Sequence, residues 1–152
     1  MSRWSILSMF AVCAVVATTA CSKQTTYPGA VYAEATVAAY KPAEFDGAMG
    51  GESSGDEGTE SSESVSWFFK TTDPKDKVVA FYEAKLVGAS KEVGEEDVTF
   101  RFVPAGAEPG EEVQVIVSEG RIQVHESTRV GKHKDADCYD KAMEASGLGW
   151  AK

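Results

Sequence analysis

Cysteine, histidine and proline are scarce in this chain of 152 residues, which has three, two and five of them. Neither Cys-x-x-Cys nor His-Glu-x-x-His occurs, so the recurrent zinc-binding spacings are excluded. The Ser-x-x-Lys element of one class of serine hydrolases is also missing. We therefore expect no cofactor and no resident metal, and a protein that is not an enzyme.

The N-terminus has the layout of an export signal. Arg3 is followed by an uncharged stretch from Trp4 to Ala20, and Cys21 stands where this stretch ends. With Thr18, Thr19 and Ala20 before it and Ser22 after it, Cys21 resembles the lipobox cysteine of bacterial lipoproteins. That resemblance implies cleavage between Ala20 and Cys21 and acylation, by palmitate among others, of Cys21. It also implies that residues 1–20 are a signal peptide and that residues 21–29 form a lipidated tether.

Membrane attachment in the cell envelope follows from the same resemblance. Ser22 implies transfer to an outer membrane, with the domain facing the periplasm. An ordinary secretory signal and an uncleaved anchor remain the alternatives, although the apolar stretch is short for a membrane-spanning helix.

The charge of the mature chain is strongly acidic. Removing Arg3 with the signal leaves 14 of the 15 basic residues and all 24 acidic ones, a net charge of −10. Such a surface repels nucleic acid and anionic lipid head groups, so no nucleic-acid partner is expected. If Cys21 is acylated, Cys138 is left without a partner for an internal disulfide.

A single domain is expected from residue 30 to residue 152, interrupted by a mobile acidic loop. From about 45 to 64, Gly, Ser, Glu and Asp dominate, and no basic residue occurs between Lys41 and Lys70. Such a stretch buries too little apolar surface to offset its ordering entropy. Alternation from Val31 to Val37 predicts a strand before this loop.

After the loop the pattern predicts strands around one main helix. Asp73 as N-cap and Pro74 as first residue predict a helix that ends near Gly88. Glu119-Gly120 predicts a tight hairpin turn. Further strands are predicted near 65–70, 98–103, 113–117 and 122–124, and a short C-terminal helix near 135–145. The expected fold is α+β, an antiparallel sheet of about four to five strands with one main helix packed on one face.

Two sequence stretches resemble patterns of small bacterial periplasmic and lipoprotein domains. They are Tyr27-Pro28-Gly29-Ala30 and the segment TTDPKDKVVAFY at 71–82. The resemblance covers about a third of the chain. It implies location and fold, and it carries no catalytic residue.

Three groups of residues could in principle carry chemistry. The segment from His133 to Cys138 holds metal-ligand types, but an acidic helix start above a packed cysteine accounts for it as well. Cys138 with His125 or His133 could form a nucleophile pair, although no motif joins them. Carboxylates of the acidic loop could bind calcium, but a solvated charge run is the simpler interpretation. Those carboxylates are Asp46, Glu52, Asp56, Glu57 and Glu60.

An exposed aromatic side chain is the remaining candidate for binding. Phe68 alternates with the apolar face of its strand, so we expect it on the opposite face, near Tyr32 or Trp150. The chain is thus predicted to be a lipid-anchored envelope protein that acts as an interaction or structural module with an envelope protein partner. The alternative is a lipoprotein that binds a small ligand or divalent cation through the acidic loop or residues 133–138.

Overall fold

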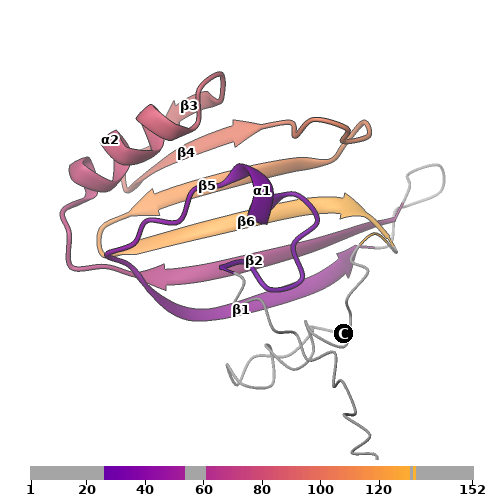
Figure 1. Ribbon diagram of the computed structural model, residues 1–152, viewed down its shortest axis with the longest axis horizontal. Coiled ribbons are helices and arrows are strands. Elements are labelled where there is room, and N and C mark those ends of the chain that lie inside the picture. Colours follow the sequence, from indigo (N-terminus) through magenta and orange to yellow (C-terminus); the bar gives the residue numbers. More distant parts are fainter. Residues whose placement is uncertain (1–25, 54–60, 131, 133–152) are drawn as a thin grey trace, which may run out of the picture.

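The chain forms one antiparallel sheet of six strands in the order β1-β2-β6-β5-β4-β3. The computed structural model describes residues 26–53, 61–130 and 132. The α+β class is confirmed, whereas the expected number of strands was too low (Figure 1). The elements are α1 Ala33–Thr36, β1 Glu44–Ser53, β2 Ser62–Lys70, α2 Lys75–Lys85, β3 Ser90–Val93, β4 Asp97–Phe102, β5 Glu112–Ser118 and β6 Arg121–Arg129.

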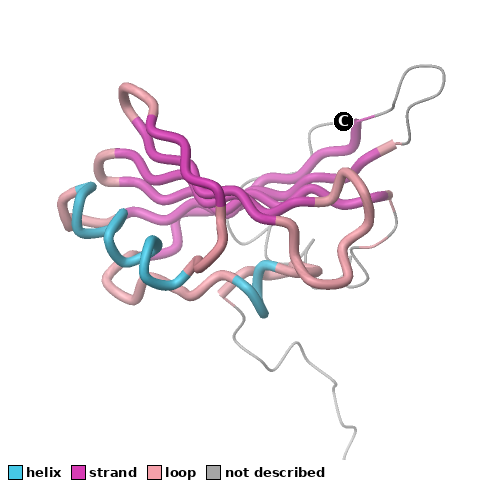
Figure 2. The backbone as a smooth tube through the Cα atoms, turned by 90° about the horizontal axis from the view of Figure 1, so that it is seen from above, coloured by secondary structure: helices cyan, strands magenta, loops and turns pink. Residues whose placement is uncertain are grey.

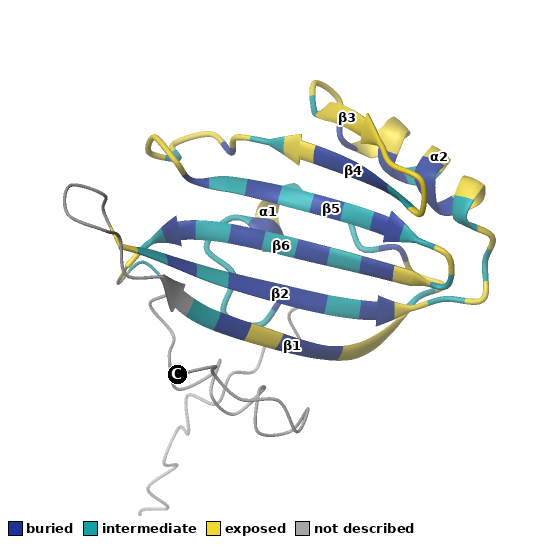
Figure 3. Cartoon of the chain, turned by 180° about the vertical axis from the view of Figure 1, so that it is seen from behind, coloured by how far each residue is buried: buried dark blue, intermediate teal, exposed yellow. Residues whose placement is uncertain are grey.

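Alternating side chains give the sheet one apolar face, which we call the covered face. In β5 the residues Val113, Val115 and Val117 are fully buried, and the residues between them are only partly so. The same alternation is visible as colour bands along the central strands (Figure 3). The strand period predicted here is therefore confirmed, and so is the tight turn at Glu119-Gly120, where Gly120 has a φ of +71°.

Two segments pack against the covered face (Figure 2). One is residues 26–43 with α1, which we call the N-terminal strap; it contributes Tyr27, Ala33, Val37 and Tyr40 to the core. The other is α2, which contributes Val78, Val79 and Tyr82 and contacts β5. The expectation of one main helix across the sheet is thus corrected, because α2 shares this face with the strap.

The start of α2 differs from the predicted one. Pro74, and not Asp73, occupies the N-cap position, and no side chain caps the helix. The Asp73 carboxylate instead accepts hydrogen bonds from the Tyr40 hydroxyl and the Lys77 ammonium. These contacts hold the pKa of Asp73 below its usual value, chiefly through the bond from Tyr40. Asp73 therefore joins α2 to the strap.

Two predicted segments have a different structure. Residues 31–37 contain α1 and not a strand, because Val31, Tyr32 and Ala33 direct their N–H groups to a carboxylate on β6. Most of the supposed acidic loop is β1 and the start of β2. Ala48 of β1 lies opposite Trp67 and is buried, so β2 supplies the apolar cover that the loop's own sequence lacks.

A second strand besides β1 was missed, and one predicted helix lies outside the described residues. All four residues of β3, Ser90–Val93, are exposed, so alternating burial gives no signal there. The predicted helix at 135–145 falls outside the part of the chain that the structure describes.

Replacing a core aromatic residue should cost far more stability than replacing an exposed one. Phe100 is 2% exposed in β4, and Phe45 is 46% exposed in β1. We expect Phe100→Ala to lower the free energy of unfolding by about 3–5 kcal/mol, since it leaves a cavity in the core. Phe45→Ala is the matched control, and urea denaturation measures both. Equal losses would contradict the assigned core.

Candidate functional site

A buried carboxylate on β6 fastens the N-terminal strap to the sheet. Glu126 is 0% exposed and faces the strap. Its two oxygens accept the backbone N–H groups of Val31, Tyr32 and Ala33 at 2.8, 3.0 and 2.7 Å. A buried carboxylate is costly unless it is hydrogen-bonded, and these amides meet that requirement.

A second buried carboxylate secures the same region. Glu111 is 1% exposed and accepts the Tyr32 hydroxyl at 2.6 Å and the Lys132 ammonium at 2.8 Å. It also accepts the backbone N–H groups of Glu108 and Arg129, at 2.8 and 3.1 Å. Burial by itself would raise the pKa of Glu111, but these hydrogen bonds outweigh it and bring the pKa to about 2. The pKa of Lys132 is raised in turn, mainly by its bond to Glu111.

The beginning of the strap is fixed by aromatic contacts. Tyr27 is 2% exposed and meets Trp67 and Phe69 edge-on, with ring centroids 5.6 and 5.7 Å apart. The Trp67 indole donates to the carbonyl of Pro28 at 3.0 Å. Burial raises the pKa of Tyr27, so its phenol stays protonated. Tyr27, six positions after Cys21 in the sequence, is therefore held firmly on the covered face.

In the part of the chain that the structure describes, no segment lies over the opposite sheet face, which we call the uncovered face (Figures 2 and 3). At its centre Ser66 Oγ lies 2.9 Å from His125 Nδ1, and Gln123 Nε2 donates to Ser66 Oγ at 3.2 Å. Burial lowers the pKa of His125, which favours the neutral imidazole. These bonds link β2 to β6.

Phe68 is half-buried on this face, between Gly47 of β1 and Gln123 of β6. Gly47 is itself buried and adds no side chain beside the Phe68 ring. Met49, two residues along β1, is 47% exposed on the same face. Phe68 and Met49 form an apolar area at the β1 side of this face, apart from Ile116 of β5, which lies opposite Gln123 on the same face.

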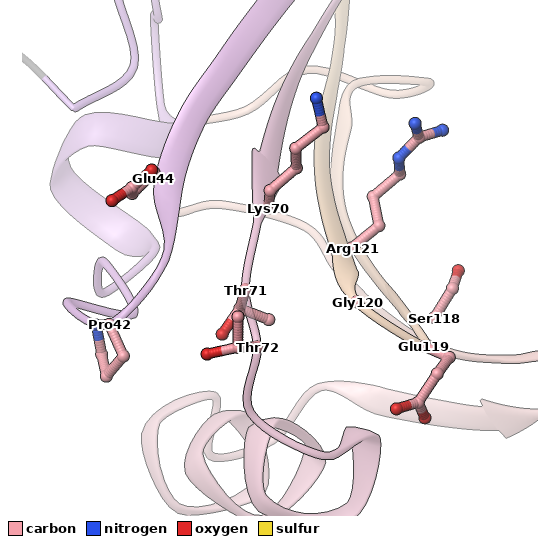
Figure 4. A pocket seen from close by; sticks show the side chains of 9 residues that line it. All are labelled: Pro42, Glu44, Lys70, Thr71, Thr72, Ser118, Glu119, Gly120 and Arg121. Atoms are coloured by element: carbon pink, nitrogen blue, oxygen red, sulfur yellow. The ribbon is translucent and has the colours of Figure 1, made fainter.

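A hollow of about 660 Å³ lies at the end of the sheet where β2 leads to α2 and β5 turns into β6. Lys70 and Arg121 are opposite each other in the register of β2 and β6, and they project in the same direction (Figure 4). Two positive charges directly opposite each other on neighbouring strands destabilise the sheet unless an anion lies nearby. Asp46 forms an ion pair with Lys70, which relieves part of this repulsion. The hollow is also lined by Pro42, Glu44, Thr71, Thr72, Ser118, Glu119 and Gly120.

The structure separates the aromatic residues that the sequence placed together. Phe68 is on the uncovered face as expected, whereas Tyr32 belongs to the strap on the covered face and binds Glu111. Ala20, Cys21, Trp150 and the segment 133–138 lie outside the described residues.

The described residues contain no group of ligands that would support the metal hypothesis, and Cys138 of the nucleophile hypothesis lies outside them. Within 26–53, 61–130 and 132, no three His, Cys, Asp or Glu side chains gather as a metal site would need. Asp46 and Glu52 lie in β1 and not in a loop, while Asp56, Glu57 and Glu60 fall outside the described ranges. Residues 51–55 have the Gly-x-Ser-x-Gly spacing of a nucleophile elbow; Ser53 is the last residue of β1, and residues 54 and 55 lie outside the described ranges.

Glu111 and Glu126 were missed as structural residues. Glu126 continues the alternation of Ile122 and Val124, so its inward direction is readable from the sequence. The partners of Glu126 cannot be read from the sequence, because they are backbone amides of a segment more than ninety residues away.

Comparisons of the chain with protein-family models, curated proteins and solved structures found no match. In the described ranges neither helix is long and apolar enough to cross a membrane.

Removing the charge of Glu126 should release the strap. In Glu126→Gln the side-chain amide N–H group would face backbone N–H donors, so we expect a loss of about 3 kcal/mol in the free energy of unfolding. Amide hydrogen exchange at 27–37 should accelerate. Glu119→Gln, at an exposed position in the β5–β6 turn, is the matched control and should change neither quantity. Unchanged exchange at 27–37 would contradict the role of Glu126.

Acid should destabilise the domain partly through Glu111. Because its folded-state pKa of about 2 lies below the usual 4.5, ionised Glu111 stabilises the fold fully above pH 4.5. This contribution is lost as the pH falls from 4.5 towards 2. Urea titrations across this range should show a smaller loss of stability in Glu111→Gln than in the wild type. The same pH dependence in both would contradict the assignment.

Proposed function

We propose that the chain is a lipid-anchored, non-enzymatic protein of the bacterial cell envelope that acts as an interaction module. The position of Cys21 at the end of the apolar N-terminal stretch supports the anchor. Attachment to an outer membrane, facing the periplasm, belongs to the same proposal and depends on Ser22.

The strap is the segment that would join the lipid anchor to the domain. Five residues separate Cys21 from Tyr27, and the six Cα–Cα steps between them reach about 20 Å when the chain is fully extended. An acylated Cys21 would therefore hold the domain close to the lipid head groups. The connection would enter at the covered face, through the strap that Glu126 and Trp67 hold.

In the part of the chain that the structure describes, an attachment through the strap would not cover the uncovered face. Phe68 and Met49 provide apolar contact area there, within a polar surface of serine, glutamine and histidine side chains. Exposed aromatic and methionine side chains framed by polar groups are typical of protein interfaces. They are the observation that favours a protein partner.

The anchor is tested by the intact mass of the full chain extracted from membranes. We expect a species that begins at Cys21 and is heavier by several acyl chains, and we expect Cys21→Ala to lose the added mass. Cys13→Ala is the matched control, because Cys13 lies within the apolar stretch, and it should keep the modification. An unmodified wild-type chain would overturn the lipid anchor.

A further inference from the structure

The two edges of the sheet are built differently. β3 is a short edge of four residues, Ser90–Val93, whose Lys91 and Glu92 are exposed. β1 is an edge of ten residues, Glu44–Ser53, with neither proline nor a basic residue. Short strands, charges and prolines are the usual means by which an edge is prevented from pairing with another chain. β3 has two of them, whereas β1 has acidic charges and, near its start at Phe45–Gly47, a β-bulge, which is a further such means.

β1 has a regular stretch that is open for hydrogen bonding. From Gly47 to Ser53 it pairs continuously with β2, residue by residue. Alternate backbone groups of such a strand point away from its neighbour. Within the described residues the outer side of β1 is paired with no strand, so those N–H and C=O groups are available to an added strand.

Apolar side chains flank this edge on both faces of the sheet. Phe45 is 46% exposed and packs on Phe69 of the covered face, and Met49 is 47% exposed on the uncovered face. Gly47 has a φ of 148° at a β-bulge, a conformation that favours glycine, and Phe68 lies opposite it in β2. A strand laid beside β1 could place an apolar side chain against Met49, next to the partly exposed Phe68.

The charge of β1 selects the kind of partner. β1 contains three acidic residues, Glu44, Asp46 and Glu52, in a chain whose net charge is −9. Glu44 and Asp46 are exposed at its start, and Asp46 is already paired with Lys70. We propose that β1 binds a basic, extended peptide segment of a partner protein by strand addition. Backbone hydrogen bonds would supply affinity, and the acids, Met49 and Phe68 would supply selectivity. The proposal deepens the interaction role proposed above and rests on it.

A second copy of the chain is a poorer occupant of this edge. Two β1 strands side by side would bring acidic residues together with no basic residue of either strand between them. Like charges on adjacent strands are destabilising. A basic partner turns the same residues into attractive contacts.

The test uses the full chain purified in detergent and a fluorescent ten-residue peptide of alternating valine and lysine. We expect saturable binding by fluorescence anisotropy and slower amide exchange in β1 when peptide is bound. Two control peptides are needed: one with glutamate in place of lysine, and one of the same sequence N-methylated at every second residue to remove the pairing N–H groups. Both should bind at least tenfold more weakly.

Met49→Lys and Val93→Lys form the matched pair of variants. Each places a lysine at an exposed apolar position, in the β1 edge and in the β3 edge respectively. Met49→Lys should weaken binding at least tenfold, and Val93→Lys should leave it unchanged, with equal melting temperatures. Equal effects of the two variants, or equal binding of the N-methylated peptide, would overturn strand addition at β1.

Three further outcomes would also overturn the proposal. The first is that no binding is seen at millimolar peptide. The second is slow amide exchange of β1 in the free monomer, which would mean that the chain covers its own edge. The third is a dimer that the Met49→Lys substitution dissociates. The Cys21→Ala chain, tested in the same way, should bind the peptide equally well. A failed anchor and a failed edge site therefore give different results.

Discussion

The carboxylate of Glu126 is the interaction on which the architecture depends. A six-stranded sheet with one apolar face needs cover, and α2 contacts that face chiefly over β5. The rest is covered by a strap whose only regular element is the four residues of α1, too short to be stable alone. Three amides directed at one buried carboxylate fix the strap, and Tyr27 and Tyr40 can then pack as core residues.

How far the sequence predicts this fold depends on whether the information is local. The alternation of Val113, Val115 and Val117 and the turn at Gly120 are properties of a few adjacent residues, and both were predicted. The helical turn at Ala33 and the strand at Ala48 are decided by distant residues, Glu126 and Trp67, and both were missed. Of the binding candidates, the face of Phe68 followed from strand period, while its separation from Tyr32 required the path of the strap.

The strap and the β1 edge are linked through the chain itself. The strap leaves the covered face at Tyr40 and runs directly into β1, which starts at Glu44. Tyr40 is held by Asp73, so the start of the edge strand is placed by the same bonds that position α2. An anchored N-terminus and a partner bound at β1 would thus both act on one continuous segment. A partner that pulls on β1 would then strain the hydrogen bond between Tyr40 and Asp73.

The glycine residues of β1 lower the stability of the free domain, and this loss bears on the role proposed for the strand. Gly47, Gly50 and Gly51 lie within one strand, and each glycine there destabilises a strand by roughly 0.5–1 kcal/mol relative to alanine. Only Gly47, with its φ of 148°, requires glycine for its backbone conformation. Small residues at an edge allow another backbone to approach closely. Acidic residues in the same strand disfavour self-pairing, and both features fit the strand addition proposed for this edge.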